Sequence, residues 1–238
     1  MIVDSSALAE QVVQDVMASG FDSAGQRCSA LRVLCLQEDI ADRILALLRS
    51  AMRELKIGDP TDLATDVGPV IDGAAQASLE AHIAAMARAG HPIHRCESST
   101  VCDAGSFVPP TLIEIDRIDE LDGEVFGPIV HVLRYPGDRL DQVVDAINAT
   151  GYGLTFGIHS RIDETVQRLA SRVRAGNIYI NRNMIGAVVG VQPFGGEGKS
   201  GTGPKAGGPF YLPRLLELAN PALETLGLRR DTDAGPRL

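Results

Sequence analysis

The stretch Phe21-Asp22-Ser23-Ala24-Gly25-Gln26-Arg27-Cys28-Ser29-Ala30 places a glycine turn and a cysteine between a helical pattern and an apolar run. Before it, residues 5–18 carry Leu8, Val12, Val13 and Val16 at helical spacing. After it, residues 31–36 form a short apolar run typical of a strand. The segment therefore predicts a helix, a turn and a strand, with the Cys28 side chain able to face a cleft.

Cys28 is the first candidate for chemistry. A thiol held at such a junction, near backbone N–H groups, can shift towards the thiolate that acts as a nucleophile. A free cysteine is more often a small hydrophobic core residue, and the local pattern alone leaves that alternative open.

The rest of the chain alternates between strand and helix patterns. Helices are expected over 38–55, 72–89, 140–149 and 163–173, and strands over 91–96, 111–115, 129–135, 154–159 and 177–181. Asp39 is expected near the N-cap of the first of these helices, and Gly90 fits the end of the second. The alternation predicts an α/β fold with a largely parallel sheet flanked by helices.

The C-terminal part of the chain does not continue the alternation of strand and helix patterns. Residues 186–208 are rich in glycine, which predicts an irregular backbone that packs closely against another part of the protein or lines a ligand pocket. We expect one domain over 1–208 and a tail over 209–238, with a helical patch at 215–219. Pro221 and Gly235-Pro236 suggest fraying beyond it.

Composition narrows the class of protein. The chain has 238 residues, 45% of them hydrophobic and 22% charged, which is typical of a globular domain. A net charge of −9 argues against nucleic-acid binding through this chain. The start shows no signal-peptide pattern and no apolar run is long enough to span a membrane, so a cytoplasmic protein is expected. The four cysteines are too few and too irregular for a disulfide framework, and reduced thiols are expected.

Two further motifs have rival interpretations. His91, His94, Cys96 and Cys102 could be drawn as zinc ligands, but their spacing matches no paired-ligand pattern, so no metal site is predicted. Gly198-Lys199-Ser200 suggests a phosphate-binding P-loop and an NTPase, but Pro193 stands where that motif needs glycine. The NTPase stays a distant alternative.

Three segments in order along the chain resemble the aldehyde dehydrogenase superfamily. They are the Phe21 to Cys28 stretch, Glu124-Val125-Phe126-Gly127-Pro128, and Gln192-Pro193-Phe194-Gly195-Gly196 through Ser200-Gly201. The resemblance implies that Cys28 is the catalytic nucleophile and that Glu124 and Phe126 contact an NAD cofactor, through a ribose hydroxyl and the nicotinamide ring. On residues alone, Glu124 would be a solvated surface acid.

Within the superfamily, the chain most resembles glutamate-semialdehyde (pyrroline-5-carboxylate) dehydrogenases, and among them the C-terminal portion of the bifunctional proline-catabolic family, proline utilization A. That resemblance implies oxidation of L-glutamate γ-semialdehyde to L-glutamate. It also implies that Ser29, Gly186 and Ala187 hold the substrate carboxylate and that Phe194 packs along its aliphatic chain. Without the resemblance, Ser29 would be interpreted as a hydroxyl at the start of a strand, Gly186 and Ala187 as a tight turn, and Phe194 as a core aromatic.

The resemblance also implies a cofactor-binding half upstream of the nucleophile, and only twenty-seven residues precede Cys28. We therefore expect a catalytic portion whose cofactor domain is missing. A noncatalytic remnant or partner subunit that keeps the fold is the alternative, and a homo-oligomer stays open.

Overall fold

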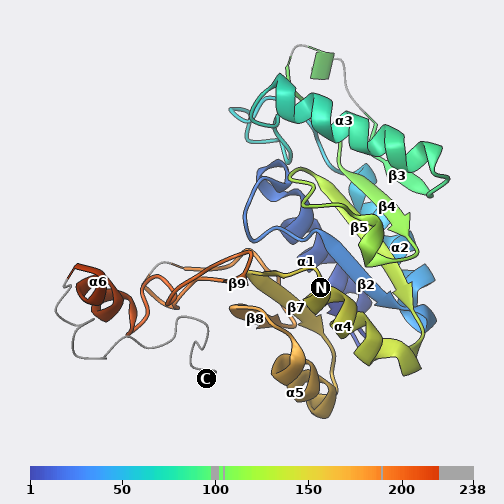
Figure 1. Ribbon diagram of the computed structural model, residues 1–238. Coiled ribbons are helices and arrows are strands. Elements are labelled where there is room, and N and C mark those ends of the chain that lie inside the picture. The colour runs from blue at the N-terminus through green and yellow to red at the C-terminus, as the bar shows by residue number, and fades with distance from the viewer. Residues whose placement is uncertain (98–101, 104, 189, 220–238) are drawn as a thin grey trace.

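The computed structural model describes residues 1–97, 102–103, 105–188 and 190–219. Its centre is a seven-stranded sheet in the order β3-β4-β5-β2-β1-β7-β8 (Figure 1). These strands are β1 (Ile2–Val3), β2 (Val33–Gln37), β3 (Ile93–Arg95), β4 (Thr111–Ile115), β5 (Ile129–Tyr135), β7 (Thr155–His159) and β8 (Asn177–Ile180). Two more strands, β6 (Tyr152–Gly153) and β9 (Glu197–Gly198), pair with each other in a separate small sheet.

In the described ranges, six α-helices accompany the strands: α1 (Ala9–Phe21), α2 (Glu38–Arg53), α3 (Gly73–Arg88), α4 (Leu140–Ala149), α5 (Asp163–Arg172) and α6 (Tyr211–Ala219). Every neighbouring pair in the large sheet is parallel except β3 and β4, which are antiparallel. The α/β fold with a largely parallel sheet is therefore confirmed.

Helices cover both faces of the sheet, as the alternation of side chains along β5 shows. Val130 lies against Gly20 of α1, where an added Cβ would overlap the valine methyl group. The next residue, His131, points the other way and meets His82 of α3. Because successive side chains of a strand face opposite sides, α1 and α3 lie on opposite faces of the sheet. Strands covered on both sides are apolar almost throughout, and β5 is buried along nearly its whole length.

Most element boundaries agree with the sequence patterns, and the exceptions have local causes. The first helix was expected from residue 5 but begins at Ala9, because Asp4 accepts hydrogen bonds from the Ser6 and Ala7 backbone and fixes a turn there. Asp39 lies in the first turn of α2, near the N-cap as expected; Gln37 occupies the N-cap itself, and its side-chain amide donates a 2.6 Å bond to Asp39. The pattern of the chain gave no sign of β1, a two-residue strand between β2 and β7.

The C-terminal part leaves the sheet after β8, and α6 lies apart from it (Figure 1). Gly198 ends β9 in the antiparallel pair of β6 and β9, and Lys199 and Ser200 follow in a turn; Lys199 Nζ lies 4.9 Å from the centre of the Tyr152 ring. This is not the strand, loop and helix of a P-loop, so the NTPase alternative gains no support. The tail helix begins at Tyr211, earlier than expected, while Pro221 and Gly235-Pro236 lie outside the described residues.

No helix in the described ranges combines the length and the apolar character that crossing a bilayer requires.

Candidate active site

Cys28 lies on the turn that joins α1 to β2, and its side chain is exposed. The chain reaches it through a short 3-10 turn, Asp22–Gly25, in which Ser23, Ala24 and Gly25 all have positive φ, at 56°, 52° and 64°. Non-glycine residues adopt this conformation at a cost, and such strain gathers at functional sites. The turn that presents the cysteine is thus held in a backbone conformation that its sequence does not favour.

The Glu124 to Pro128 segment packs against this turn. A Cβ at Gly25 would overlap the backbone carbonyl of Gly127, so only glycine allows the two backbones to approach this closely. The nucleophile segment and the Glu124 to Pro128 segment, about a hundred residues apart in the sequence, are therefore in backbone contact.

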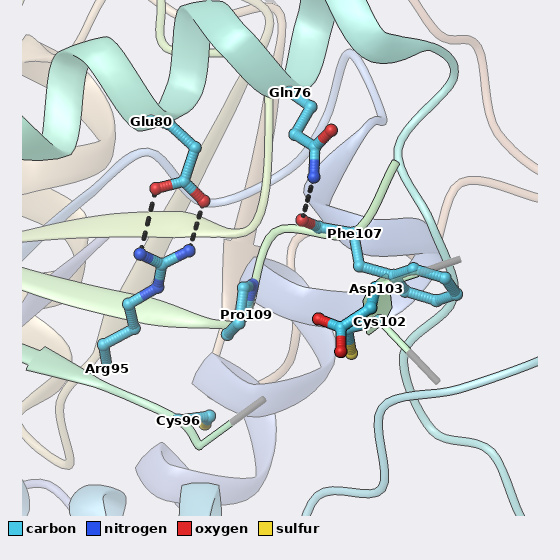
Figure 2. A pocket seen from close by; sticks show the side chains of 8 residues that line it. All are labelled: Gln76, Glu80, Arg95, Cys96, Cys102, Asp103, Phe107 and Pro109. Carbon is cyan, nitrogen blue, oxygen red and sulfur yellow. Dashed lines mark hydrogen bonds and ion pairs between the residues drawn. The ribbon is translucent and has the colours of Figure 1, made fainter. Parts of the chain in front are cut away.

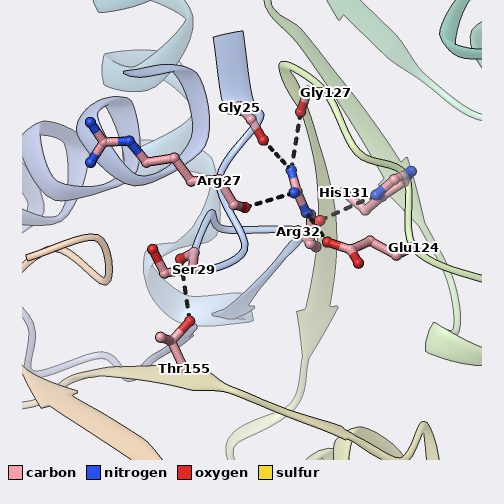
Figure 3. Close-up of polar contacts among 8 residues, drawn as sticks. All are labelled: Gly25, Arg27, Ser29, Arg32, Glu124, Gly127, His131 and Thr155. Carbon is pink, nitrogen blue, oxygen red and sulfur yellow. Dashed lines mark hydrogen bonds and ion pairs between the residues drawn. The ribbon is translucent and has the colours of Figure 1, made fainter. Parts of the chain in front are cut away.

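Arg32 ties the same two segments together (Figure 3). Its guanidinium donates to the carbonyl oxygens of Gly25, Arg27 and Gly127 at 2.6, 3.0 and 3.3 Å. It also donates to Glu124 Oε1 at 3.0 Å. Burial lowers the pKa of Arg32, and the charge of Glu124 opposes that shift. Arg32 therefore serves as a cross-link between the two segments.

Glu124 and Phe126 share this arginine. The Arg32 guanidinium carbon lies 4.6 Å from the centre of the Phe126 ring, at cation–π distance. The Glu124 side chain is 36% exposed, and Phe126 is 41% exposed. The structure thus brings together the carboxylate and the ring that were predicted to contact a cofactor, and leaves both accessible.

A pair of histidines lies beside the Arg32 backbone carbonyl. The Nε2 atoms of His82 and His131 are 2.9 Å apart, and His131 Nδ1 lies 3.2 Å from the Arg32 carbonyl oxygen. Burial, and next the neighbouring His82, lowers the pKa of His131 to about 4, so this histidine is neutral at neutral pH. A neutral ring that donates from Nδ1 accepts through Nε2, which assigns the donor role to His82.

Hydrogen bonds connect Ser29 to the Phe194 segment. The Thr155 hydroxyl donates to the Ser29 carbonyl at 3.2 Å, and Thr155 pairs in register with Asn177. The Asn177 side chain then bonds both flanks of Phe194: it donates to the Pro193 carbonyl at 2.9 Å and accepts from the Gly195 N–H at 3.2 Å. Ser29 itself is buried, and Phe194 is half-buried.

Gly186 and Ala187 follow β8 in a half-buried stretch. An added Cβ at Gly186 would meet the far end of the flexible Arg182 side chain, whose guanidinium lies 3.5 Å from the Gly186 carbonyl oxygen. The glycine thus lets the Arg182 guanidinium approach the backbone of this stretch closely.

The other cysteines have different surroundings. Burial raises the pKa of both Cys35 and Cys96 to about 11, and Cys96 Sγ donates to the Met52 carbonyl. Cys96 and Cys102 line a hollow of about 300 Å³ beside the ion pair of Glu80 and Arg95 (Figure 2). None of its lining residues belongs to the Cys28 turn.

His91 and His94 are not among the residues that line this hollow; His91 contacts Glu114 and Glu120 instead. Over the ranges that the structure describes, no three His, Cys, Asp or Glu side chains gather so as to hold a metal ion.

Comparison with known proteins identifies the family. The model of the aldehyde dehydrogenase family matches residues 1–220. The chain belongs to the aldehyde dehydrogenase family. Members of this family generally use NAD or NADP.

Individual relatives are similar to this chain over most of its length. The bifunctional protein PutA of Klebsiella aerogenes is 62% identical over 221 residues, which cover 91% of this chain and 17% of that protein. The 1-pyrroline-5-carboxylate dehydrogenase of Geobacillus sp. (strain WCH70) is 36% identical over 216 residues, covering 89% of this chain and 41% of that enzyme. A crystal structure of bifunctional proline utilization A (PutA) superposes with a TM-score of 0.85 at 56% identity, covering 90% of this chain and 21% of that one.

The chain therefore spans about a fifth of the PutA relatives and about two fifths of the 1-pyrroline-5-carboxylate dehydrogenases that it matches.

Proposed function

We propose that this chain supplies the nucleophile and part of the cofactor and substrate sites for NAD-dependent oxidation of L-glutamate γ-semialdehyde to L-glutamate in proline catabolism. The observation that carries the proposal is the exposed Cys28 on a strained turn, in backbone contact with the loop that presents Glu124 and Phe126. PutA proteins and 1-pyrroline-5-carboxylate dehydrogenases among the relatives support the substrate.

In this proposal the Cys28 thiolate attacks the aldehyde carbon, and the carbonyl electron pair moves onto oxygen. The backbone N–H of Cys28 donates to the oxyanion that forms. A bound nicotinamide cofactor, NAD in this proposal, supplies the acceptor for the hydride that leaves the carbon. Cys28 is then held as a thioester. Attack by water breaks the bond from sulfur to carbon and gives the carboxylic acid and the Cys28 thiol, which release their protons to solvent as the carboxylate and the thiolate form.

The residues present fit such a cofactor. Glu124 offers an exposed carboxylate that can accept from a ribose hydroxyl, and Phe126 offers an exposed aromatic face beside it. Arg32 would hold both in place through its bonds to Glu124 and its contact with the ring. The remaining cofactor contacts would come from a further portion of an aldehyde dehydrogenase domain.

The substrate carboxylate would be held by Ser29 and by the backbone at Gly186 and Ala187, with Phe194 along the aliphatic chain. A carboxylate that meets N–H groups and a hydroxyl makes charge-assisted hydrogen bonds. The bonds from Thr155 and Asn177 support this arrangement, because they fix Ser29 and the Phe194 segment to neighbouring strands. The same proposal places the catalytic domain at 1–208, the tail at 209–238 and the protein in the cytoplasm.

A chimera provides the test. This chain would replace the matching segment of the Klebsiella aerogenes PutA, and NADH production would be followed with glutamate semialdehyde. We expect turnover that Cys28→Ala abolishes and that Cys102→Ala, a matched control, leaves intact. A folded chimera that binds NAD yet keeps its activity in Cys28→Ala would overturn the assignment. A folded chimera without turnover would favour the noncatalytic alternative.

A second substitution tests the substrate. Ala187→Leu in the same chimera should reduce kcat/KM for glutamate semialdehyde on the order of a hundredfold, because its side chain would block the carboxylate anchor. Oxidation of propanal, which has no carboxylate, should change far less. Equal losses for the two aldehydes would contradict the proposed anchor.

A further inference from the structure

Helix α1 carries a polar stripe of three residues, Gln11, Asp15 and Ser19, spaced four residues apart. Side chains at this spacing lie on one face of a helix. The neighbouring Val12, Val13 and Val16 are buried in the core. Asp15 and Ser19 are buried as well, at 8% and 0% exposure, so the stripe is not a solvated surface.

The polar stripe meets the backbone of residues 181–184, which follow β8. Gln11 Nε2 donates to the Asn181 carbonyl at 2.7 Å, and the Ser19 hydroxyl accepts from the Met184 N–H at 3.0 Å. Between them, the Asp15 carboxylate faces the Asn183 backbone; burial raises the Asp15 pKa, and the Asn183 N–H opposes that shift. Two positions on one face of the helix thus bond two positions along one loop, and the buried Asp15 lies between them.

The end of β7 holds the same loop from the other side. The Asn181 N–H donates to the Ile158 carbonyl at 2.8 Å. The Asn181 side chain accepts from the Ser160 N–H at 3.0 Å and donates to the Ser160 carbonyl at 2.9 Å. Asn181 has a φ of 51°, a left-handed conformation that asparagine tolerates better than most residues. The loop is therefore fixed on two sides.

The loop and α1 lead to the two ends of the proposed substrate site. Residues 181–184 continue directly into Gly186 and Ala187, while α1 continues through its strained turn to Cys28. A substrate that binds at its aldehyde carbon and at a distal carboxylate needs a fixed spacing between these two points. Small displacements of bound reactants cost large factors in rate.

We propose that Gln11, Asp15 and Ser19 are positioning residues that set the spacing between Cys28 and the Gly186–Ala187 anchor, and so select aldehydes that carry a carboxylate at a fixed distance. This inference rests on the proposed function and deepens it. The polar stripe does not touch the substrate; it acts through the loop.

The test uses the chimera described above, with two changes in the stripe. Gln11→Glu keeps the shape of the side chain but removes the donor to Asn181. Ser19→Ala removes the acceptor and leaves the buried Met184 N–H unpaired. The matched control is Gln14→Glu, which makes the same charge change on the same helix at an exposed position outside the stripe.

Both stripe variants should raise KM for glutamate semialdehyde. The ratio of kcat/KM for glutamate semialdehyde to kcat/KM for propanal should fall by about tenfold. The control should match the parent chimera. Hydrogen exchange of the isolated chain should also quicken in peptides over 181–188 in the two variants and not in the control.

The outcomes separate the two proposals. An unchanged preference for glutamate semialdehyde over propanal in the stripe variants, or exchange in 181–188 equal to that of the control, would overturn the positioning role. Equal losses for both aldehydes would also overturn it, because they indicate general loss of structure. A parent chimera that shows no preference at all would instead overturn the proposed function, whatever the exchange shows.

Discussion

Arg32 is the residue that the sequence did not single out and the structure makes central. It follows Cys28 by four positions, in a stretch where the pattern indicates only the start of a strand. Its partners Glu124 and Gly127 lie more than ninety residues away in the sequence. An arginine close in sequence to a candidate nucleophile could have been singled out as a candidate site residue. Its partners could not, because they depend on which loops the fold brings together.

Labelling can test the reactivity of Cys28. With substoichiometric iodoacetamide on the folded chain, we expect most of the adduct on Cys28, because it is exposed. Cys35 and Cys96, whose pKa values burial raises to about 11, would be thiolate in about one molecule in a thousand at pH 8. Peptide mapping by mass spectrometry gives the distribution. Modification of Cys35 or Cys96 ahead of a protected Cys28 would show that the exposed turn is not the reactive site.

At the scale of elements, the packing of α3 on β5 places His82 and His131 in contact beside the Arg32 backbone carbonyl. His131 is 1% exposed and neutral, and it bonds the Arg32 carbonyl. A neutral buried histidine makes this contact sensitive to acid, because protonation would place a charge in the core.

The free energy of unfolding should therefore fall as the pH is lowered from 7 to 5. The folded pKa of His131, about 4, lies below the unfolded value of 6.5, so the unfolded chain takes up the proton first. The stability from this residue is present above about pH 6.5 and is lost as the pH falls towards 4. His131 should account for about 2 kcal/mol of the loss between pH 7 and pH 5.

Urea unfolding of the chain and of His131→Gln at several pH values measures this contribution. The variant should lose less stability than the parent over the same range. An equally steep loss in His131→Gln would assign the acid sensitivity to other groups.

At the scale of the whole molecule, the chain carries the proposed nucleophile, two proposed cofactor contacts and the proposed substrate loop, while it spans only part of the length of its relatives. Glu124 and Phe126 offer a ribose acceptor and a ring, whereas dinucleotide sites also bind the pyrophosphate, typically at a helix N-terminus. We therefore expect the isolated chain to produce no NADH from glutamate semialdehyde.

Adding the remaining part of the Klebsiella aerogenes aldehyde dehydrogenase domain in trans should restore some activity if the two parts pack together. Glu124→Gln should then weaken the cofactor-dependent step. The decisive measurement is the rate of NADH formation with and without the added part. Robust turnover by the chain alone, lost in Cys28→Ala, would show that these residues form a complete site.

The sequence by itself determined the order and kind of most elements, since periodicity and turn residues act over a few positions. The strands β4 and β5 and the helix α4 begin and end where their patterns predict. The motifs around Cys28, Glu124 and Gln192 likewise indicated the family, which the comparison confirmed. The assigned roles of the site residues stay predictions.

Only the tertiary structure decided what these segments meet. It placed the two-residue β1 inside the sheet, joined Arg32 to Glu124, set Gly25 against Gly127 and laid the polar stripe of α1 along residues 181–184. Each of these contacts joins residues far apart in the sequence. Their formation depends on sheet order and helix packing, which the whole core fixes at once, so no local pattern of residues records them.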